Sequence, residues 1–187
     1  MGYSEQLRDI RSLVKANSEP EARDMLLAIL RRHAPELAVS ALAALTEVDI
    51  VADVANVRAQ LERLLKVEPP SRKIDAIYFG LFDRLDEHGA EVIGFYASGV
   101  KGFDPEDPDS LCDPSWWPKN RHLSSKFLNV LKAVERASSG ETRSALAYAG
   151  ELGAGVLLVQ FAAAGVLVER PLVVGFDSSD FIVLGLH

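Results

Sequence analysis

The spacing of apolar residues changes at Pro69 and Pro70, and this change constrains the fold more than any other feature. Each proline lacks a backbone N–H and biases the residue before it toward extended backbone, so a helix is expected to end there. Before the break, apolar residues recur every three or four positions, as in a helix packed on one side. The clearest stripe is Ile50, Val54, Val57, Leu61 and Leu64. We therefore expect a helical segment over residues 1–68, made of three or four short antiparallel helices.

After the break, four segments have the Val, Ile, Phe and Tyr content that is typical of strands. They are residues 74–83, 91–98, 172–176 and 181–186, paired as hairpins through turns at 86–89 and 177–180. Two helical stretches separate the hairpins. This order predicts an α+β fold over residues 72–187, with a four-stranded antiparallel sheet and two helices on one face. The helical segment and this region form either two units or one continuous core.

Capping residues predict where the helices begin, because Ser, Thr and Asp side chains accept hydrogen bonds from the first free N–H groups. Proline is also favoured in a first helical turn. The second of the two later helices is expected to start at a capping box of Ser138 and Glu141 and to run to about Ala164. The predicted starts are Ser18, Pro35, Thr46 or Asp49, Ser124 or Ser125, and Ser138.

The longest apolar run, Leu152–Val168, has Gln160 as its only polar side chain. Its seventeen residues reach the lower limit for crossing a membrane, but its glycines and the lack of flanking aromatic residues favour a buried helix. The N-terminus has no signal-peptide pattern, and a single cysteine, Cys112, suits a reducing compartment. We therefore expect a soluble, cytoplasmic protein that does not enter membranes.

Acidic residues outnumber basic ones, 27 to 20, which gives a net charge of −7. Binding to nucleic acid requires clustered Lys and Arg, so no nucleic-acid partner is expected. The excess is concentrated in residues 71–122, with 10 acidic and 6 basic side chains. Five acidic residues lie within ten positions that contain no Lys or Arg. They are Asp104, Glu106, Asp107, Asp109 and Asp113.

Three interpretations of this acidic loop stay open. Its carboxylates could bind calcium, but the alternation of ligands and the central glycine of an EF-hand are missing. An acidic surface could steer a basic protein partner toward it. The loop could also be simply a solvated turn region, since Asp-Pro steps favour turns.

Both tryptophans of the chain, Trp116 and Trp117, follow this loop. Neighbouring residues in extended backbone point in opposite directions, so one ring can anchor the loop while the other faces outward. An outward Trp117 or Trp116 near Arg121 would suit a binding hot spot, because Trp and Arg dominate such sites. In the alternative, both rings cover the sheet and Arg121 pairs with an acid such as Asp113.

Motifs for catalysis or for metal binding are weak. Cys112 and His122 could form a nucleophile and base only if they met in space, and nearby acids would raise the pKa of the thiol. His88 adds no metal-ligand spacing, so we expect no metal and no cofactor. Enzymatic activity is therefore the less favoured hypothesis. It would need a pocket between sheet and helices that holds Tyr78, Tyr96, Arg121 or His122.

Several short motifs in residues 74–123 resemble those of small bacterial cytosolic proteins, some of which are similar to the immunity partners of polymorphic toxins. The motifs are Tyr78–Asp83, Gly94–Gly99, Phe103-Asp104, Cys112-Asp113, Trp116-Trp117-Pro118 and Arg121. The resemblance implies a non-catalytic protein that binds and occludes a toxin. The expected function is therefore binding of a basic protein through the acidic loop together with Trp116, Trp117 and Arg121.

Overall fold

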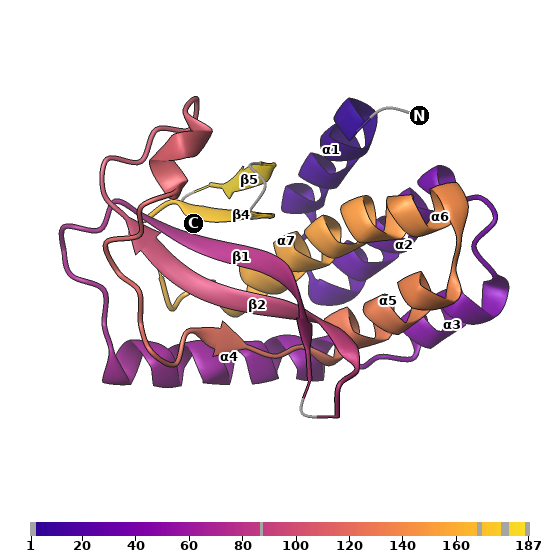
Figure 1. The fold of residues 1–187 in the computed structure, drawn as a ribbon, viewed down its shortest axis with the longest axis horizontal. Helices are drawn as coiled ribbons and strands as arrows, with labels where there is room; N and C mark the ends of the chain where they lie inside the picture. The colour runs from indigo at the N-terminus through magenta and orange to yellow at the C-terminus, as the bar shows by residue number, and fades with distance from the viewer. Residues whose placement is uncertain (1–2, 87, 168–169, 177–179, 186–187) are drawn as a thin grey trace.

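In the computed structural model the chain forms an α+β fold, and the structure describes residues 3–86, 88–167, 170–176 and 180–185. The helices and strands are arranged as Figure 1 shows. The helical elements are α1 (Tyr3–Arg11), η1 (Ser12–Lys15), α2 (Glu19–His33), α3 (Val39–Thr46), α4 (Ile50–Val67), η2 (Pro108–Leu111), α5 (Lys126–Ala137), α6 (Gly140–Ala145), a π-helical turn η3 (Leu146–Gly150) and α7 (Glu151–Ala162). The strands are β1 (Ala76–Leu85), β2 (Glu91–Val100), β3 (His122–Leu123), β4 (Leu172–Phe176) and β5 (Phe181–Leu184).

The strands form one mixed sheet in the order β3-β2-β1-β4-β5. Both expected hairpins are present as antiparallel pairs, with Tyr78 opposite Ser98 in the first and Val173 opposite Val183 in the second. The prediction of a four-stranded, wholly antiparallel sheet was wrong, because β1 and β4 are parallel and β3 adds a fifth strand. The helices between the hairpins return the chain to the end of the sheet where β1 began, so β4 runs in the same direction as β1. The predicted turn at 177–180 lies largely outside the described residues.

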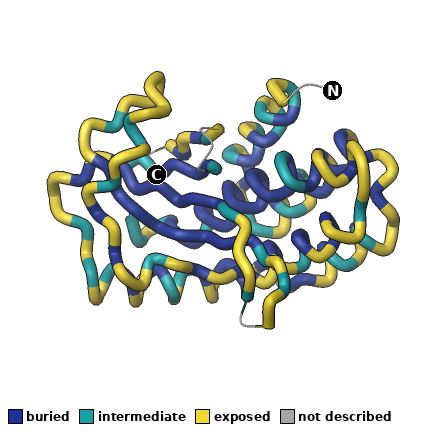
Figure 2. The backbone as a smooth tube through the Cα atoms, viewed as in Figure 1, coloured by how far each residue is buried: buried dark blue, intermediate teal, exposed yellow. Residues whose placement is uncertain are grey.

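The two faces of the sheet are covered differently. Alternate side chains of β1, beginning with Ile77 and Phe79, pack with the helices in the main core. The others, beginning with Ala76 and Tyr78, pack in a smaller cluster. Phe103 and Leu111 of the acidic loop, residues 101–115, help to cover this cluster. Figure 2 shows buried backbone along the strands and exposed backbone along the loop. One face is therefore sealed by helices, and the other is covered by a loop.

Helix α7 lies at the centre of the molecule, where it packs on β1, β4 and β5 and on α2, α4 and α5. It belongs to the continuous helix Gly140–Ala162, which by length and composition alone could cross a membrane, but 83% of its most apolar stretch is buried inside the fold. Gly153 allows this close packing, since a Cβ there would lie 2.5 Å from Leu26 of α2. The main core contains residues of both α2 and β1, and the division into 1–68 and 72–187 stays a prediction.

Most predicted helix starts are confirmed. Ser18, Asp49 and Ser125 accept hydrogen bonds from the backbone N–H groups of Glu21, Ala52 and Leu128, in that order. Two starts were wrong. Pro35 lies before α3, which begins at Val39. Ser138 is the C-cap of α5, where its hydroxyl donates to the Val134 carbonyl, and α6 begins after Ser139.

Buried Asp53 of α4 strengthens the start of α5. Its carboxylate accepts hydrogen bonds from the Ser125 hydroxyl at 2.6 Å and from the backbone N–H groups of Lys126 and Phe127 at 2.9 Å each. A carboxylate at a helix N-terminus satisfies free donors and interacts favourably with the helix dipole. This contact ties the helical segment to the α+β region directly after β3.

Candidate functional site

The acidic loop, residues 101–115, is shaped by its own carboxylates. Asp104 accepts a hydrogen bond from the Glu106 N–H at 2.9 Å, and Asp107 caps η2 by accepting from the Asp109 N–H at 3.0 Å. The Ser110 hydroxyl closes the loop by bonding to the backbone of Asp104. Asp104 and Asp107 are therefore used to build the loop, which is how such residues commonly act in turns.

The other three acidic residues of the loop are exposed and have no such use. In the described part of the chain, no side-chain hydrogen bond or ion pair holds the carboxylates of Glu106, Asp109 and Asp113. All three stay available to solvent or to a partner. Of the five predicted acidic residues, two therefore form hydrogen bonds that shape the loop, and three have carboxylates with no partner among the described residues.

The two tryptophans behave as strand geometry predicts. Trp116 is buried, its backbone pairs with Gly99 of β2, and its indole N–H donates to the Glu68 carbonyl at 2.9 Å. Glu68 also accepts hydrogen bonds from the backbone N–H groups of Lys119 and Asn120. The end of α4 therefore holds this segment in place, and Trp116 anchors it to the fold.

Trp117 faces outward and is 48% exposed. The guanidinium carbon of Arg121 lies 4.1 Å from the centre of its ring, and the Tyr96 ring meets it edge to face at 5.2 Å. Arg121 also donates to the Pro118 carbonyl at 3.2 Å. The predicted ion pair between Arg121 and Asp113 is not formed, because stacking on Trp117 and this hydrogen bond hold the guanidinium instead. A large exposed ring is thus held in one orientation before any partner binds.

A row of rings continues from Trp117 across the loop-covered face. Between ring centres, the distance is 6.0 Å from Tyr96 to Tyr78, 5.8 Å from Tyr96 to Phe82 and 5.6 Å from Phe82 to His122. Partial burial, and then the charges of nearby arginines, lower the pKa of His122 below its ordinary value. His122 is therefore neutral at neutral pH, and it acts here as another flat ring.

Two glycines allow these rings to lie flat on the sheet. A Cβ on Gly80 would lie 2.2 Å from the ring of Tyr96, and one on Gly94 would lie 2.3 Å from the ring of Phe82. A glycine inside a strand commonly marks either a bulge or a close contact. The regular pairing of β1 and β2 shows that these two glycines mark close contacts.

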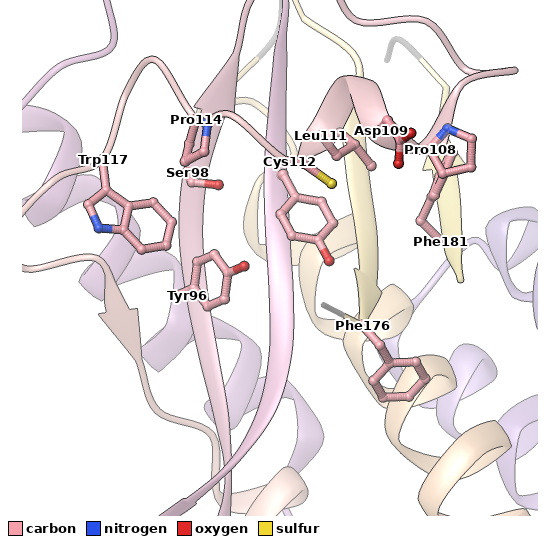
Figure 3. A pocket seen from close by; sticks show the side chains of 11 residues that line it. Tyr96, Ser98, Pro108, Asp109, Leu111, Cys112, Pro114, Trp117, Phe176 and Phe181 are labelled. Atoms are coloured by element: carbon pink, nitrogen blue, oxygen red, sulfur yellow. The ribbon is translucent and has the colours of Figure 1, made fainter. Parts of the chain in front are cut away.

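A cleft of about 270 Å³ opens between the acidic loop and the sheet. Figure 3 shows Trp117 on one side and Asp109, Pro108 and Phe181 on the other. Ser98 of β2, only 2% exposed, also lines the cleft. Its hydroxyl makes no hydrogen bond with any residue that the structure describes. We name this space the loop cleft.

A second cleft, of about 410 Å³, lies between the ends of β1 and β4 and helices α1 and α5 to α7. We name it the helix cleft. Lys132 is buried at its base, and its ammonium lies 2.6 Å from Asp83, 2.8 Å from Glu135 and 3.4 Å from Glu151. Arg143 at the rim lies 3.4 Å from the other oxygen of Glu135. Sequence analysis missed this cluster.

Glu151 holds a proton in this cluster. Burial, and then a hydrogen bond to Glu135, raise the pKa of Glu151 to about 8 despite the opposing effect of Lys132. Burial alone would lower the pKa of Lys132, but hydrogen bonds to Asp83 and Glu135 reverse this and raise it above its ordinary value. At neutral pH the cluster is therefore a charged lysine between two carboxylates, with a protonated Glu151 beside them. Perturbed groups of this kind mark either functional sites or structural ion-pair networks.

Catalysis by Cys112 and His122 gains no support from their positions. Cys112 is exposed on the loop, whereas His122 contacts Phe82 and Tyr96 on the sheet. Across the described ranges, no group of three His, Cys, Asp or Glu side chains is placed to hold a metal ion. The predicted residues that the structure brings together are Asp109 and Trp117, which line the loop cleft, and Arg121, which stacks on Trp117.

Comparison with known proteins adds no identity: no family model, no curated protein and no solved structure matches this chain.

Proposed function

We propose that this chain is a non-catalytic protein-binding module, of the immunity type, that binds a basic protein through the acidic loop and Trp117. The observation that carries the proposal is the half-exposed Trp117, held between Arg121 and Tyr96, in a cleft that the unpaired carboxylate of Asp109 also lines. Large exposed aromatic side chains beside arginine are typical of binding hot spots.

The preset orientation of Trp117 supports a role in binding. Ordering a flexible side chain at an interface costs about 0.5–1.5 kcal/mol, and this cost is already met in the free protein. The exposed carboxylates of Glu106, Asp109 and Asp113 would steer a basic partner toward the ring and repel acidic competitors. The interface that we propose is therefore Glu106, Asp109, Asp113, Trp117 and Arg121, with Asp104, Asp107 and Trp116 as its support.

The test begins with isolation of the tagged full chain from its native host at low salt. Proteins that co-purify in stoichiometric amount are identified by mass spectrometry, and the association rate of the purified partner is then measured. Reversing two charges with Asp109→Lys and Asp113→Lys should slow association by on the order of tenfold at low salt and reduce its salt dependence.

The matched control reverses Glu36 and Glu47, two exposed acidic residues of the helical segment. It changes the net charge equally, so its association rate should stay near that of the wild type if the loop is the interface. Equal slowing in both variants would indicate an effect of net charge only. Unchanged kinetics in both, or the absence of a basic partner, would contradict the proposal.

The second candidate function is a small enzyme or a small-molecule-binding domain. It is favoured by the helix cleft, where Lys132, Glu135 and Glu151 lie at the base of an open space. Against it, Lys132 already contacts the carboxylates of Asp83 and Glu135 and the carboxyl group of Glu151, which leaves its ammonium no donor for a ligand. Filling the cleft with Ala147→Trp tests this function. A compound that raises the unfolding temperature of the wild type and not of this variant would support it.

A further inference from the structure

The loop cleft contains polar groups that the folded chain does not use. Ser98 is 2% exposed and lines the cleft, and its hydroxyl makes no hydrogen bond with the described residues. Because the cleft is open, this hydroxyl can form a hydrogen bond with a group that enters it. The carboxylate of Asp109, also unpaired, lies at the edge of the same cleft.

The remaining walls of the loop cleft are mainly aromatic. Tyr78, Tyr96, Phe176 and Phe181 come from four strands of the sheet, and Trp117 comes from the segment between the acidic loop and β3. Ring faces carry partial negative charge and attract cations, and they also pack well against methylene chains. Rings, one carboxylate and one hydroxyl together suit a side chain that is apolar along its length and positively charged at its tip.

We infer that the loop cleft receives one lysine or arginine side chain of the basic partner. This inference rests on the proposed function and names the anchor within it. The methylene chain lies against the rings, Asp109 balances the positive charge, and Ser98 supplies a hydrogen-bond acceptor within the cleft. Long-range steering by the acidic loop and local binding in the cleft are then separate contributions to affinity.

The two tryptophans give this inference a direct readout, because each indole N–H produces its own NMR signal. The probes are blocked tripeptides, Ala-Lys-Ala, Ala-Arg-Ala and Ala-norleucine-Ala, added to the ¹⁵N-labelled full chain. The lysine or arginine peptide should shift the Trp117 signal with saturation. The signal of Trp116, whose N–H is bonded to Glu68, should stay in place. The norleucine peptide, which lacks the charge, should bind at least about threefold more weakly.

Two variants that each remove one negative charge distinguish a direct contact inside the cleft from long-range attraction by the acidic loop. Asp109→Asn removes the carboxylate in the cleft, whereas Glu106→Gln removes one from the same loop outside it. Asp109→Asn should weaken binding of the lysine peptide by about threefold, and Glu106→Gln should leave it nearly unchanged. The remaining NMR signals show whether each variant keeps the fold.

An unmoved Trp117 signal at the solubility limit of the charged peptides would overturn the inference, as would equal binding of the norleucine peptide or equal effects of the two variants. If a purified basic partner still bound through the loop in that case, the proposed function would stand without this anchor. If instead the peptides bound as expected but no basic partner existed, the cleft would stand and the proposed function would fail.

Discussion

The helix cleft and the loop cleft share Phe176 in their walls but treat polar groups in opposite ways. In the helix cleft, Lys132 is buried, and carboxyl groups from β1, α5 and α7 surround its ammonium. In the loop cleft, the Asp109 carboxylate and the Ser98 hydroxyl have no hydrogen-bond partner among the described residues. Polar groups that pair with one another hold a fold together, whereas polar groups left unpaired at an open surface are available to a ligand. The comparison indicates a structural role for the helix cleft and supports our proposal that the loop cleft binds a partner.

The largest expected effect tests the structural half of this comparison. Lys132→Met leaves the buried carboxyl groups of Glu135 and Glu151, and the exposed carboxylate of Asp83, without their cation, so the free energy of unfolding should fall by about 3–5 kcal/mol. Arg143→Met removes the exposed cation that contacts the same Glu135, and it should cost less than about 1 kcal/mol. Urea unfolding measures both. Similar small losses would mean that the cluster does not stabilise the fold.

The two tryptophans test the same distinction between structural and binding residues, now on the face of the sheet that the acidic loop covers. Trp116→Ala empties a buried site and breaks the hydrogen bond to Glu68, so the unfolding free energy should fall by about 3–5 kcal/mol. Trp117→Ala removes a half-exposed ring and should cost about 1 kcal/mol. For partner binding by the folded proteins, Trp117→Ala should have the greater effect. A large stability loss at Trp117 would make it a structural residue and contradict its role in binding.

The proton on Glu151 gives the helix cleft a signature in the pH dependence of stability. The pKa of Glu151 is about 8 in the fold, against 4.5 ordinarily, so the folded state holds one more proton between these values. Its contribution to stability is complete below pH 4.5, is lost as pH rises toward 8, and is absent above it. The loss is at most about 1.4 kcal/mol per pH unit.

Glu151→Gln cannot titrate, so this variant should gain stability relative to the wild type as pH rises from 6 to 8. If the unfolding free energies of the variant and the wild type changed equally between pH 6 and 8, Glu151 would already be ionised in the fold. The same variant should leave binding at the loop cleft unchanged, because Glu151 does not line it.

Local patterns predicted the helices and the hairpins but not how the hairpins join. All five residues of the stripe from Ile50 to Leu64 are buried, and Trp116 and Trp117 point in opposite directions as extended backbone requires. The parallel pairing of β1 and β4 depends on how α5 to α7 return the chain, and periodicity carries no signal for it. The two residues of β3 are too few to form a pattern.

The helix cleft could not be predicted because its charges are far apart in the sequence. Asp83 ends a predicted strand, Lys132 and Glu135 lie on α5, and Glu151 looked like the polar boundary of an apolar run. Only a fold that brings β1, α5 and α7 together makes them neighbours. A partial signal was present, since Lys132 and Glu135 lie on the same buried face of α5 as Leu128 and Leu131.

The reactivity of Cys112 tests the central claim, that the loop cleft attracts cations, most directly. Cys112 is the chain's single cysteine and lines this cleft, so two methanethiosulfonate reagents, one with a trimethylammonium group and one with a sulfonate, sample its potential. Relative to their rates with blocked cysteine, the cationic reagent should be favoured about fivefold at low salt. The preference should shrink in Asp109→Asn more than in Glu106→Gln. Equal normalised rates for the two reagents, or a preference for the sulfonate, would contradict the account.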